Sequence, residues 1–204
     1  MGDSIIATMD TYDQMIYAVG KGPTQTRVTA SPAVLSLNNG VMIQGYVTDI
    51  SAGTKDDKIA LRFPNGVPAV ADESMSDWML YVYKQFSRPM NAKGVKVTLS
   101  VLDANNNYRE IGKTTANSDG FFTFNWKPDI EGQYTVYASF AGSESYWPSH
   151  AVTSFAVDPA PAPAQTPAYP TPVDNTGLLY GILGGVIAAI VIGLAAVFLS
   201  IRKK

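Results

Sequence analysis

The run Val95-Lys-Val-Thr-Leu-Ser-Val-Leu102 decides the fold, because apolar and polar residues alternate along it. Every second residue from Val95 to Val101 is apolar, so these side chains share one face of an extended strand. The three asparagines at 105–107, just after this run, are typical of a turn. The pattern predicts a strand with one buried face that ends in a tight connection.

Further runs of β-type composition lie on both sides of this strand. They cover residues 41–48, 108–115, 121–126, 132–140 and 151–157. Asn38-Asn-Gly40 and Asn117-Ser-Asp-Gly120 supply turn residues between them. Short strands at this spacing indicate a sandwich of two sheets. The sequence therefore predicts an all-β protein, with an immunoglobulin-like β-sandwich over residues 24–158.

The segment Asp129-Ile-Glu-Gly-Gln-Tyr134 supports this architecture. A glycine two residues before a strand tyrosine is typical of the tyrosine corner of immunoglobulin-like domains. In that motif the tyrosine hydroxyl bonds to nearby backbone. We expect Tyr134 to make this bond, and the alternative is an ordinary inward-facing tyrosine.

Residues 51–93 interrupt the strand pattern and are predicted to form an insertion with one helix, at about 74–86. Ser74-Met-Ser-Asp77 has the spacing of a capping box, and Arg88-Pro89 favours a helix end. Apolar residues at helical spacing then predict a stripe that lies on the sandwich. The stripe consists of Met75, Trp78, Met79 and Val82. We interpret these residues as packing rather than as a ligand platform.

The C-terminal residues 177–201 carry no charge, and five of them are glycine. A helix of this length is about 37 Å long, enough to cross a hydrocarbon core of about 30 Å. Arg202, Lys203 and Lys204 come after it, and Asp174 lies on the other side. The positive-inside rule places the basic tail 202–204 in the cytoplasm and the body outside the cell membrane. The expected localisation is therefore a single-pass membrane protein.

Small residues recur at every fourth position of this segment and form one helix face. They are Gly177, Gly181, Gly185, Ala189 and Gly193. Such a face allows close contact between membrane helices, so lateral self-association is one expectation. The alternative is that small residues are simply common in membrane helices.

Residues 159–176 are predicted to form a stalk between the body and the membrane. Six of the fourteen residues from Pro159 to Pro172 are proline. Proline lacks the N–H group and favours extended geometry, so this Pro-rich linker is expected to be a polyproline II spacer of roughly 40 Å. The alternative is a proline-rich ligand for a small recognition domain.

The first 25 residues do not read as a signal peptide, because Asp3, Asp10 and Asp13 interrupt any apolar core. Two interpretations remain open. The chain is the C-terminal part of a longer exported protein, or it is tail-anchored with its body in the cytoplasm. The first interpretation is favoured.

A family resemblance supports the first interpretation. Ile5 to Gly20 reads as strand, turn, strand, and resembles the hairpin that closes a blade of quinoprotein-type (PQQ-like) β-propellers. The chain after this hairpin is similar to the C-terminal region of archaeal cell-surface proteins with such propellers. Three stretches carry the likeness: Arg62–Val70 leading to Asp72–Trp78, Pro128–Thr135, and Phe140–Ser149.

The resemblance implies a longer chain whose upstream part holds the propeller and the export signal. Residues 1–22 would then be the end of a blade. A propeller needs several four-stranded blades, and this chain has at most half of one. Neither propeller activity nor a quinone cofactor is therefore carried over, and no cofactor is expected.

Composition excludes several functions. The 17 acidic residues outnumber the 15 basic ones, and three basic residues lie at the extreme C-terminus, which argues against a nucleic-acid partner. There is no cysteine, and His150 is the only histidine. Ser149 adjoins His150, but neighbouring residues of a strand point to opposite faces, so this pair is not expected to act as nucleophile and base. The sequence predicts no enzyme and no catalytic residue.

Two weaker candidates for binding sites remain. Asp103, Asn105 and Asn107 offer oxygen ligands at alternate positions, as the start of a calcium loop does, but the rest of that pattern is missing. A plain turn is the favoured interpretation. Trp126, Tyr146 and Trp147 could stack on a sugar ring, and Trp147, predicted to lie in a loop, is the best of them. Packing is the favoured interpretation of these aromatic residues.

Three functions remain, in order of preference. The first is a non-catalytic, extracytoplasmic structural module that anchors a surface protein and acts as a spacer. The second is a binding or adhesion module for a glycan or a protein, which would use the insertion or the Trp147 loop. The third is the non-catalytic end of a redox enzyme whose propeller is missing.

Overall fold

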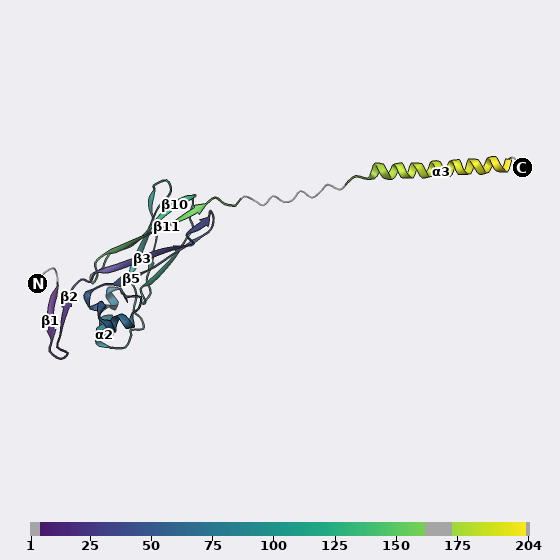
Figure 1. Cartoon of the computed structure of the whole chain (residues 1–204). Coiled ribbons are helices and arrows are strands. Elements are labelled where there is room, and N and C mark those ends of the chain that lie inside the picture. Colours follow the sequence, from purple (N-terminus) through teal and green to yellow (C-terminus); the bar gives the residue numbers. More distant parts are fainter. Residues whose placement is uncertain (1–4, 162–172, 203–204) are drawn as a thin grey trace. The chain divides into compact units, whose positions relative to one another are not determined.

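The computed structural model describes residues 5–161 and 173–202. The chain divides into two units, Met1–Pro161 and Ala162–Lys204. The described strands and short helices all belong to the first unit, and the second contains one long helix (Figure 1).

The first unit contains strands and short helices along its whole length. The strands are β1 (Ile6–Asp10), β2 (Met15–Val19), β3 (Thr24–Ser31), β4 (Val34–Ser36), β5 (Val41–Asp49), β6 (Val67–Pro68), β7 (Lys96–Leu102), β8 (Tyr108–Thr115), β9 (Phe121–Trp126), β10 (Gly132–Phe140) and β11 (Ser149–Asp158). The helices are η1 (Ala52–Lys55), α1 (Asp57–Arg62), η2 (Asp72–Ser74) and α2 (Met75–Lys84), where η marks a 3-10 helix.

Two sheets form the sandwich. In one sheet, β5 pairs antiparallel with β3, β6 and β9; the other has the order β4-β11-β10-β7-β8. The chain passes from the first sheet to the second between β3 and β4, and β4 then pairs parallel with β11. A first strand divided between two sheets, over otherwise antiparallel pairs, is an immunoglobulin-like arrangement. The predicted fold class is confirmed.

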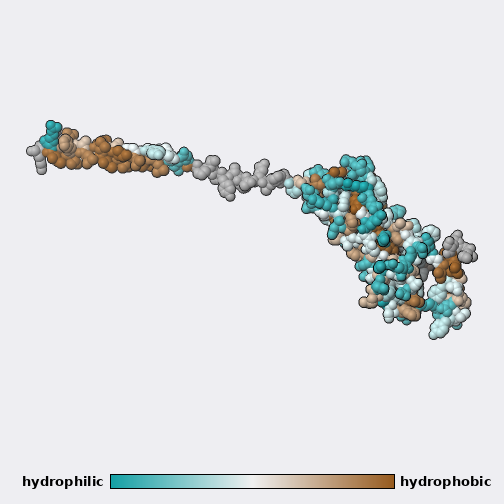
Figure 2. All heavy atoms as spheres, turned by 180° about the vertical axis from the view of Figure 1, so that it is seen from behind, coloured by the Kyte–Doolittle hydropathy of each residue, from teal (hydrophilic) through white to brown (hydrophobic). Residues whose placement is uncertain are grey.

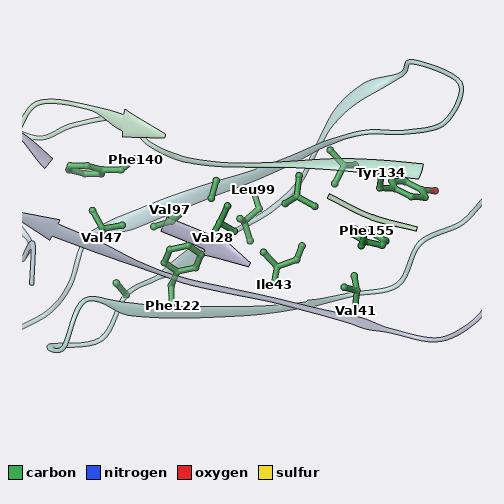
Figure 3. Packing of buried hydrophobic residues seen from close by; sticks show 14 of the residues in the cluster. Val28, Val41, Ile43, Val47, Val97, Leu99, Phe122, Tyr134, Phe140 and Phe155 are labelled. Atoms are coloured by element: carbon green, nitrogen blue, oxygen red, sulfur yellow. The ribbon is translucent and has the colours of Figure 1, made fainter. Parts of the chain in front are cut away.

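The main core lies between the two sheets, as Figure 3 shows. Val97, Leu99 and Val101 of β7 are fully buried, as their alternation predicts. They face Ile43 of β5 and Phe122 of β9, which are also buried. Alternating strands on both sides thus bury one apolar face each, which is the main driving force for this fold.

The insertion differs in detail from its prediction. It contains α1 and two 3-10 helices besides the expected helix, and α2 ends at Lys84, with Gln85 in the left-handed region at φ 60°. The prediction of a capping box is wrong. The backbone is already helical at Ser74, and the Ser74 side chain makes no capping hydrogen bond. The Ser74 hydroxyl instead accepts a hydrogen bond from the N–H of Lys93 (3.1 Å).

The apolar stripe of α2 packs mainly within the insertion rather than on the sandwich. Trp78 and Val82 are buried in a second cluster with Ile59 of α1, Val67 and Val70. Among the stripe residues, Met75 and Met79 are partly buried, and Met75 also packs against the main core. The expectation of a stripe lying on the sandwich is therefore corrected. The stripe belongs to a satellite core, and β6, which contributes Val67 to that core, pairs antiparallel with β5 and so joins the insertion to the first sheet.

The N-terminal strands β1 and β2 form a separate two-stranded hairpin. Ile6 pairs with Val19, and Met9 pairs with Ile16. These four side chains are 54% to 75% exposed, which is unusual for large apolar residues in a sheet. The structure therefore contains the strand, turn and strand predicted for this segment, but with few buried side chains.

The second unit is the helix α3 (Thr176–Arg202). Its 27 residues make it about 40 Å long. It is the one helix among residues 5–161 and 173–202 that is long and apolar enough to cross a membrane. Figure 2 shows apolar residues along much of its surface, and none of its described side chains is buried.

Candidate functional site

The hydroxyl group of Tyr134 bonds to the chain just before its own strand. It accepts a hydrogen bond from the N–H of Ile130 (3.2 Å) and lies 3.3 Å from the Ile130 carbonyl oxygen and 3.1 Å from the Asp129 carboxylate. Burial raises the pKa of the Tyr134 phenol, which keeps it neutral. The ring stacks on Phe155 with 5.2 Å between centroids. The Tyr134 hydroxyl thus links β10 to the turn that precedes it, which is the geometry expected of a tyrosine corner.

Trp126 lies next to this corner, and its surroundings favour packing. Its ring is 5.3 Å from that of Tyr134, and the Arg109 guanidinium lies 5.8 Å from the Trp126 ring centre. Arg109 also pairs with Asp129 and lowers the pKa of that carboxyl to about 2. A shallow groove of about 290 Å³ lies here, lined by Arg109, Glu110, Ile111, Trp126, Lys127 and Asp129.

Asp103, Asn105 and Asn107 form a closed turn. One Asp103 carboxylate oxygen accepts hydrogen bonds from the N–H groups of Asn105 and Asn107, both at 2.9 Å. The other accepts from the Asn107 side-chain amide (3.2 Å). The N–H of Asn107 is the main cause that lowers the pKa of Asp103. The carboxylate already has the partners of an Asx-type turn, which favours the interpretation as a plain turn.

Trp147 lies on the loop before β11 and is 50% exposed. Its backbone N–H donates to the Gly22 carbonyl oxygen (2.9 Å), and the ammonium group of Lys21 lies 5.2 Å from the ring centre. Trp147 is therefore available at the surface with a cation on its ring. Tyr146, its neighbour, is 2% exposed and cannot stack on a ligand.

Asp72 of the insertion fixes the same loop from the other side. Its carboxylate accepts hydrogen bonds from the Ser143 hydroxyl (2.8 Å) and from the N–H groups of Glu144 and Ser145 (both 3.0 Å). These bonds outweigh the effect of burial, and the pKa of Asp72 is lowered. Three segments far apart in the chain, around Gly22, Asp72 and Ser145, therefore meet at one end of the sandwich.

A buried carboxylate lies at the same end. Asp49, the last residue of β5, is 5% exposed and accepts a hydrogen bond from the N–H of Ser51 (2.7 Å). Burial raises the pKa of Asp49. Burial, reinforced by the negative charge of Asp49, also raises the pKa of Tyr83 to about 12, and the same two causes raise the pKa of Tyr146.

Trp78 is fully buried, so it offers no surface to a ligand. Its indole N–H has no acceptor among residues 5–161 and 173–202. The guanidinium of Arg88 lies 5.8 Å from its ring centre and pairs with Asp119 in the turn before β9. Trp78 thus acts in packing the insertion, as its spacing predicts.

His150 and Ser149 are neighbours on β11, and the Ser149 hydroxyl is bonded to β3 rather than to the imidazole. Its partners are the hydroxyl groups of Thr24 (2.8 Å) and Thr26 (2.7 Å). In the part of the chain that the structure describes, no three His, Cys, Asp or Glu side chains gather as a metal site would require.

The small-residue face of the C-terminal helix lies along α3. A Cβ atom added at any of its glycines would meet no heavy atom within 4 Å outside the helix itself; these are Gly177, Gly181, Gly185 and Gly193. Ala189 belongs to the same exposed helix. Arg202 is the last residue of α3, whereas Lys203 and Lys204 lie outside the described residues, as does most of the stalk.

Several residues with well-defined roles carry no sequence signal. Asp72 bonds to residues 71 to 73 positions away, and Lys84 pairs with Asp10 and Asp13, more than 70 positions away. Charged residues at the surface are common, and nothing in their spacing predicts which partners they meet. Only the fold brings these groups together.

Comparisons with known proteins add little to this geometry. No protein-family model matches the chain, and no curated protein matches it. Among solved structures, the chain is similar to the CARDB domain of a Pyrococcus furiosus protein, crystallised in complex with di-metal ions. The identity is 13%, the TM-score is 0.33, and the match covers 74% of this chain and 99% of that one. At these values the likeness says nothing about what this chain binds.

Proposed function

We propose that this chain is a non-catalytic, membrane-anchored structural module that lies outside the cell membrane and acts as a spacer for a surface protein. In this proposal α3 crosses the bilayer once, residues 159–176 form the stalk, and the sandwich carries whatever is attached at its far end. Lipid is then the one obligatory partner. The body is outside, and the basic tail is in the cytoplasm.

The positions where the chain enters and leaves the sandwich carry the proposal. Gly22 pairs in parallel with Tyr146, just before β11, and its N–H donates to the Ser145 carbonyl oxygen (2.9 Å). The ten residues of β11 span roughly 30 Å at about 3.3 Å each. Because the Pro-rich segment starts at Pro159, the chain enters at one end of β11 and leaves at the other, as a spacer requires.

The membrane anchor is supported by the composition and length of α3. The helix α3 is about 40 Å long and carries no charge before Arg202. Because it is apolar on every side, exposing it to water is unfavourable, and a bilayer would bury it. The positive charges at its C-terminal end favour a cytoplasmic tail. Both features support a single-pass anchor with the sandwich outside.

The hairpin supports the further proposal that the module ends a longer, propeller-containing chain. Isolated two-stranded hairpins are at best marginally stable in water, and Ile6, Met9 and Ile16 are more than half exposed here. Additional strands beside the hairpin would cover these residues and satisfy its free edges. A propeller blade is one structure that would do so. The choice of a propeller blade rests on the sequence resemblance alone.

A surface-binding role is the second candidate, and one observation favours it. Trp147 is half exposed and lies beside Lys21, on a loop whose residues 143–145 donate hydrogen bonds to Asp72. A fixed aromatic ring at a surface can stack on a sugar or anchor a protein partner. The insertion contributes less to this candidate, since Trp78 is buried.

Protease accessibility tests the anchor and its orientation. A protease-cleavable epitope tag is inserted between Asp158 and Pro159 of the full chain, and right-side-out vesicles are treated with protease. The proposal expects cleavage in intact vesicles and recovery of α3 in the membrane fraction. A tag after Lys204 serves as the control and should stay protected until the membrane is broken.

The opposite pattern contradicts the proposal. Protection of the tag before Pro159 with cleavage of the C-terminal one would mean a tail-anchored protein with its body in the cytoplasm. Recovery of the whole chain in the soluble fraction would contradict the anchor itself. Either result leaves the fold untouched but removes the spacer function.

A further inference from the structure

Lys84 lies at the C-terminal end of α2 and contacts three residues of the N-terminal hairpin. Its ammonium group donates to one carboxylate oxygen of Asp10 (3.0 Å) and one of Asp13 (2.5 Å). It also lies 4.3 Å from the centre of the Tyr17 ring, whose hydroxyl donates to Asp13 (2.6 Å). We call Lys84, Asp10, Asp13 and Tyr17 the Lys84 clamp.

The two aspartates of the clamp are also bonded to the backbone of the hairpin turn. The second oxygen of Asp10 accepts the N–H of Tyr12, and the second oxygen of Asp13 accepts the N–H of Met15, both at 3.0 Å. Each carboxylate therefore uses one oxygen to hold the turn and the other to bind Lys84. The two acceptors need little reordering to bind the cation, which lowers the entropic cost of the contact.

The insertion holds the other side of the clamp in place. Arg62 of α1 donates to the carbonyl oxygens of Tyr81 (3.0 Å) and Val82 (3.1 Å) in the last turns of α2. Arg88, just after α2, donates to Asp119 (2.6 Å) in the sandwich. Lys84 therefore extends from a helix end whose position relative to the sandwich is fixed.

Among the described residues, little else holds the hairpin beyond its chain connection at Gly22. Its large apolar residues are mostly exposed, at 75% for Ile16 and 60% for Met9. Hydrophobic burial between the hairpin and the rest of the first unit is correspondingly small. An ionic contact in such a position decides orientation rather than folding.

We propose that the Lys84 clamp fixes the orientation of the N-terminal hairpin relative to the sandwich. In this proposal the insertion of residues 51–93 positions Lys84 for that contact. Whatever is attached to the hairpin is thereby held in a defined direction. The inference concerns contacts within the first unit and does not depend on the membrane anchor.

Because charged groups form the clamp, we expect salt concentration to weaken it, whereas changes of pH near neutrality should not. The contact with Lys84 lowers the pKa of Asp13 to about 2, and the same contact raises the pKa of Lys84. The ion pair therefore persists across the neutral range. Its members are 28% to 37% exposed, so 1 M salt, with a screening length of about 3 Å, should weaken it.

Distance measurements between two spin labels test the proposal on the full chain in detergent micelles. The chain has no cysteine, so Ala18→Cys on the hairpin and Ser154→Cys on β11 take the labels alone. Pulsed electron double resonance should give a narrow distance distribution for this parent. Lys84→Met should widen it at least two-fold, and 1 M NaCl should widen the parent but not the variant further.

Matched variants separate orientation from folding. Lys93→Met removes an ion pair on the same insertion, with Glu73 (2.8 Å), and should leave the distribution narrow. Asp10→Asn with Asp13→Asn keeps the acceptors for the turn but removes the charges, and should widen it as Lys84→Met does. An unchanged distribution in Lys84→Met, or equal widening in Lys93→Met, would overturn the proposal. Circular dichroism melting confirms that each variant remains folded.

Discussion

The hydroxyl of Tyr134 accepts a hydrogen bond from the backbone N–H of Ile130, 3.2 Å away, across the turn that leads into its own strand. The same hydroxyl lies 3.1 Å from the Asp129 carboxylate, which pairs with Arg109 of β8. One fully buried side chain thus joins a turn to another strand of the same sandwich. These bonds lie in the connection between β9 and β10.

Replacing Tyr134 by phenylalanine should destabilise the sandwich by about 1 to 2 kcal/mol, because the Ile130 N–H loses its acceptor while the ring stays packed. The unfolding free energy can be measured by urea titration of the full chain in detergent, with tryptophan fluorescence as the signal. Trp126, whose ring is 5.3 Å from that of Tyr134, reports on this region.

Tyr137→Phe is the matched control for this substitution. Tyr137 lies on the same strand, and its ring packs against Tyr108 on the outer face (5.7 Å). Its variant should stay within about 0.5 kcal/mol of the wild type. Equal losses in the two variants would show that the Tyr134 hydroxyl has no special role in the turn.

Strands β5, β7, β8, β9, β10 and β11 of the sandwich were predicted from the sequence, whereas β3, β4 and β6 were not. Alternation from Val95 to Val101 places every second residue in the core, and Val97, Leu99 and Val101 are indeed fully buried. The predicted strand at 108–115 coincides with β8 (Tyr108–Thr115). Local pattern and tertiary burial agree in β7, so a period of two residues is a sufficient signal there, whereas no residue of β8 is fully buried.

The insertion could be predicted only in part, because its helices are short. The six residues of α1 are too few to show a helical period, and Ile59 is its one buried residue. The two 3-10 helices have no buried residue at all. The helix α2 could be predicted because Trp78 and Val82 recur at helical spacing, but that spacing does not say which core they join.

The contacts at the end of the sandwich could not be predicted, since they join residues far apart in the sequence. Asp72 and Ser143 are 71 positions apart, and Lys84 and Asp10 are 74 apart. Spacing rules describe neighbours on one helix or strand, whereas these pairs depend on how the insertion packs on the sandwich. The interpretation of Asp103 as a turn residue needed only local sequence.

Replacing Asp72 by alanine should loosen the loop at 141–148 more than it destabilises the domain. Three donors, on Ser143, Glu144 and Ser145, lose their shared acceptor, and the expected cost is about 1 kcal/mol because the site is exposed to water. Amide hydrogen exchange should speed up in this loop. The exchange rates of β10 should stay unchanged, and faster exchange throughout the sandwich would contradict a local role.

Replacing Asp49 by asparagine should change how stability depends on pH. Burial raises the pKa of Asp49 in the folded chain above that in the unfolded chain. Its contribution to stability is therefore fully present below the unfolded pKa and is lost as the pH rises through the folded pKa. The variant, which cannot ionise, should gain stability relative to wild type between about pH 4 and pH 7.

Urea titrations of both proteins at about pH 4 and pH 7 check this prediction. Comparing the two proteins cancels the contributions of other carboxylates, such as Asp129, whose lowered pKa acts in the opposite direction. Asparagine keeps an oxygen that can accept the N–H of Ser51. A difference between wild type and variant that is the same at both pH values would mean that Asp49 does not ionise differently on folding.

Self-association through α3 remains a prediction from the sequence, and adjacent glycines offer a sharp test. Gly185 belongs to the small-residue face, whereas Gly184 is rotated by about 100° from it. Gly185→Leu should reduce energy transfer between labelled full-length chains in lipid vesicles at least two-fold, because leucine separates the two backbones. Gly184→Leu adds the same side chain and should leave the transfer unchanged. Equal energy transfer in both variants and wild type would show that this face does not bring two chains together, and the anchor would then act as a single helix.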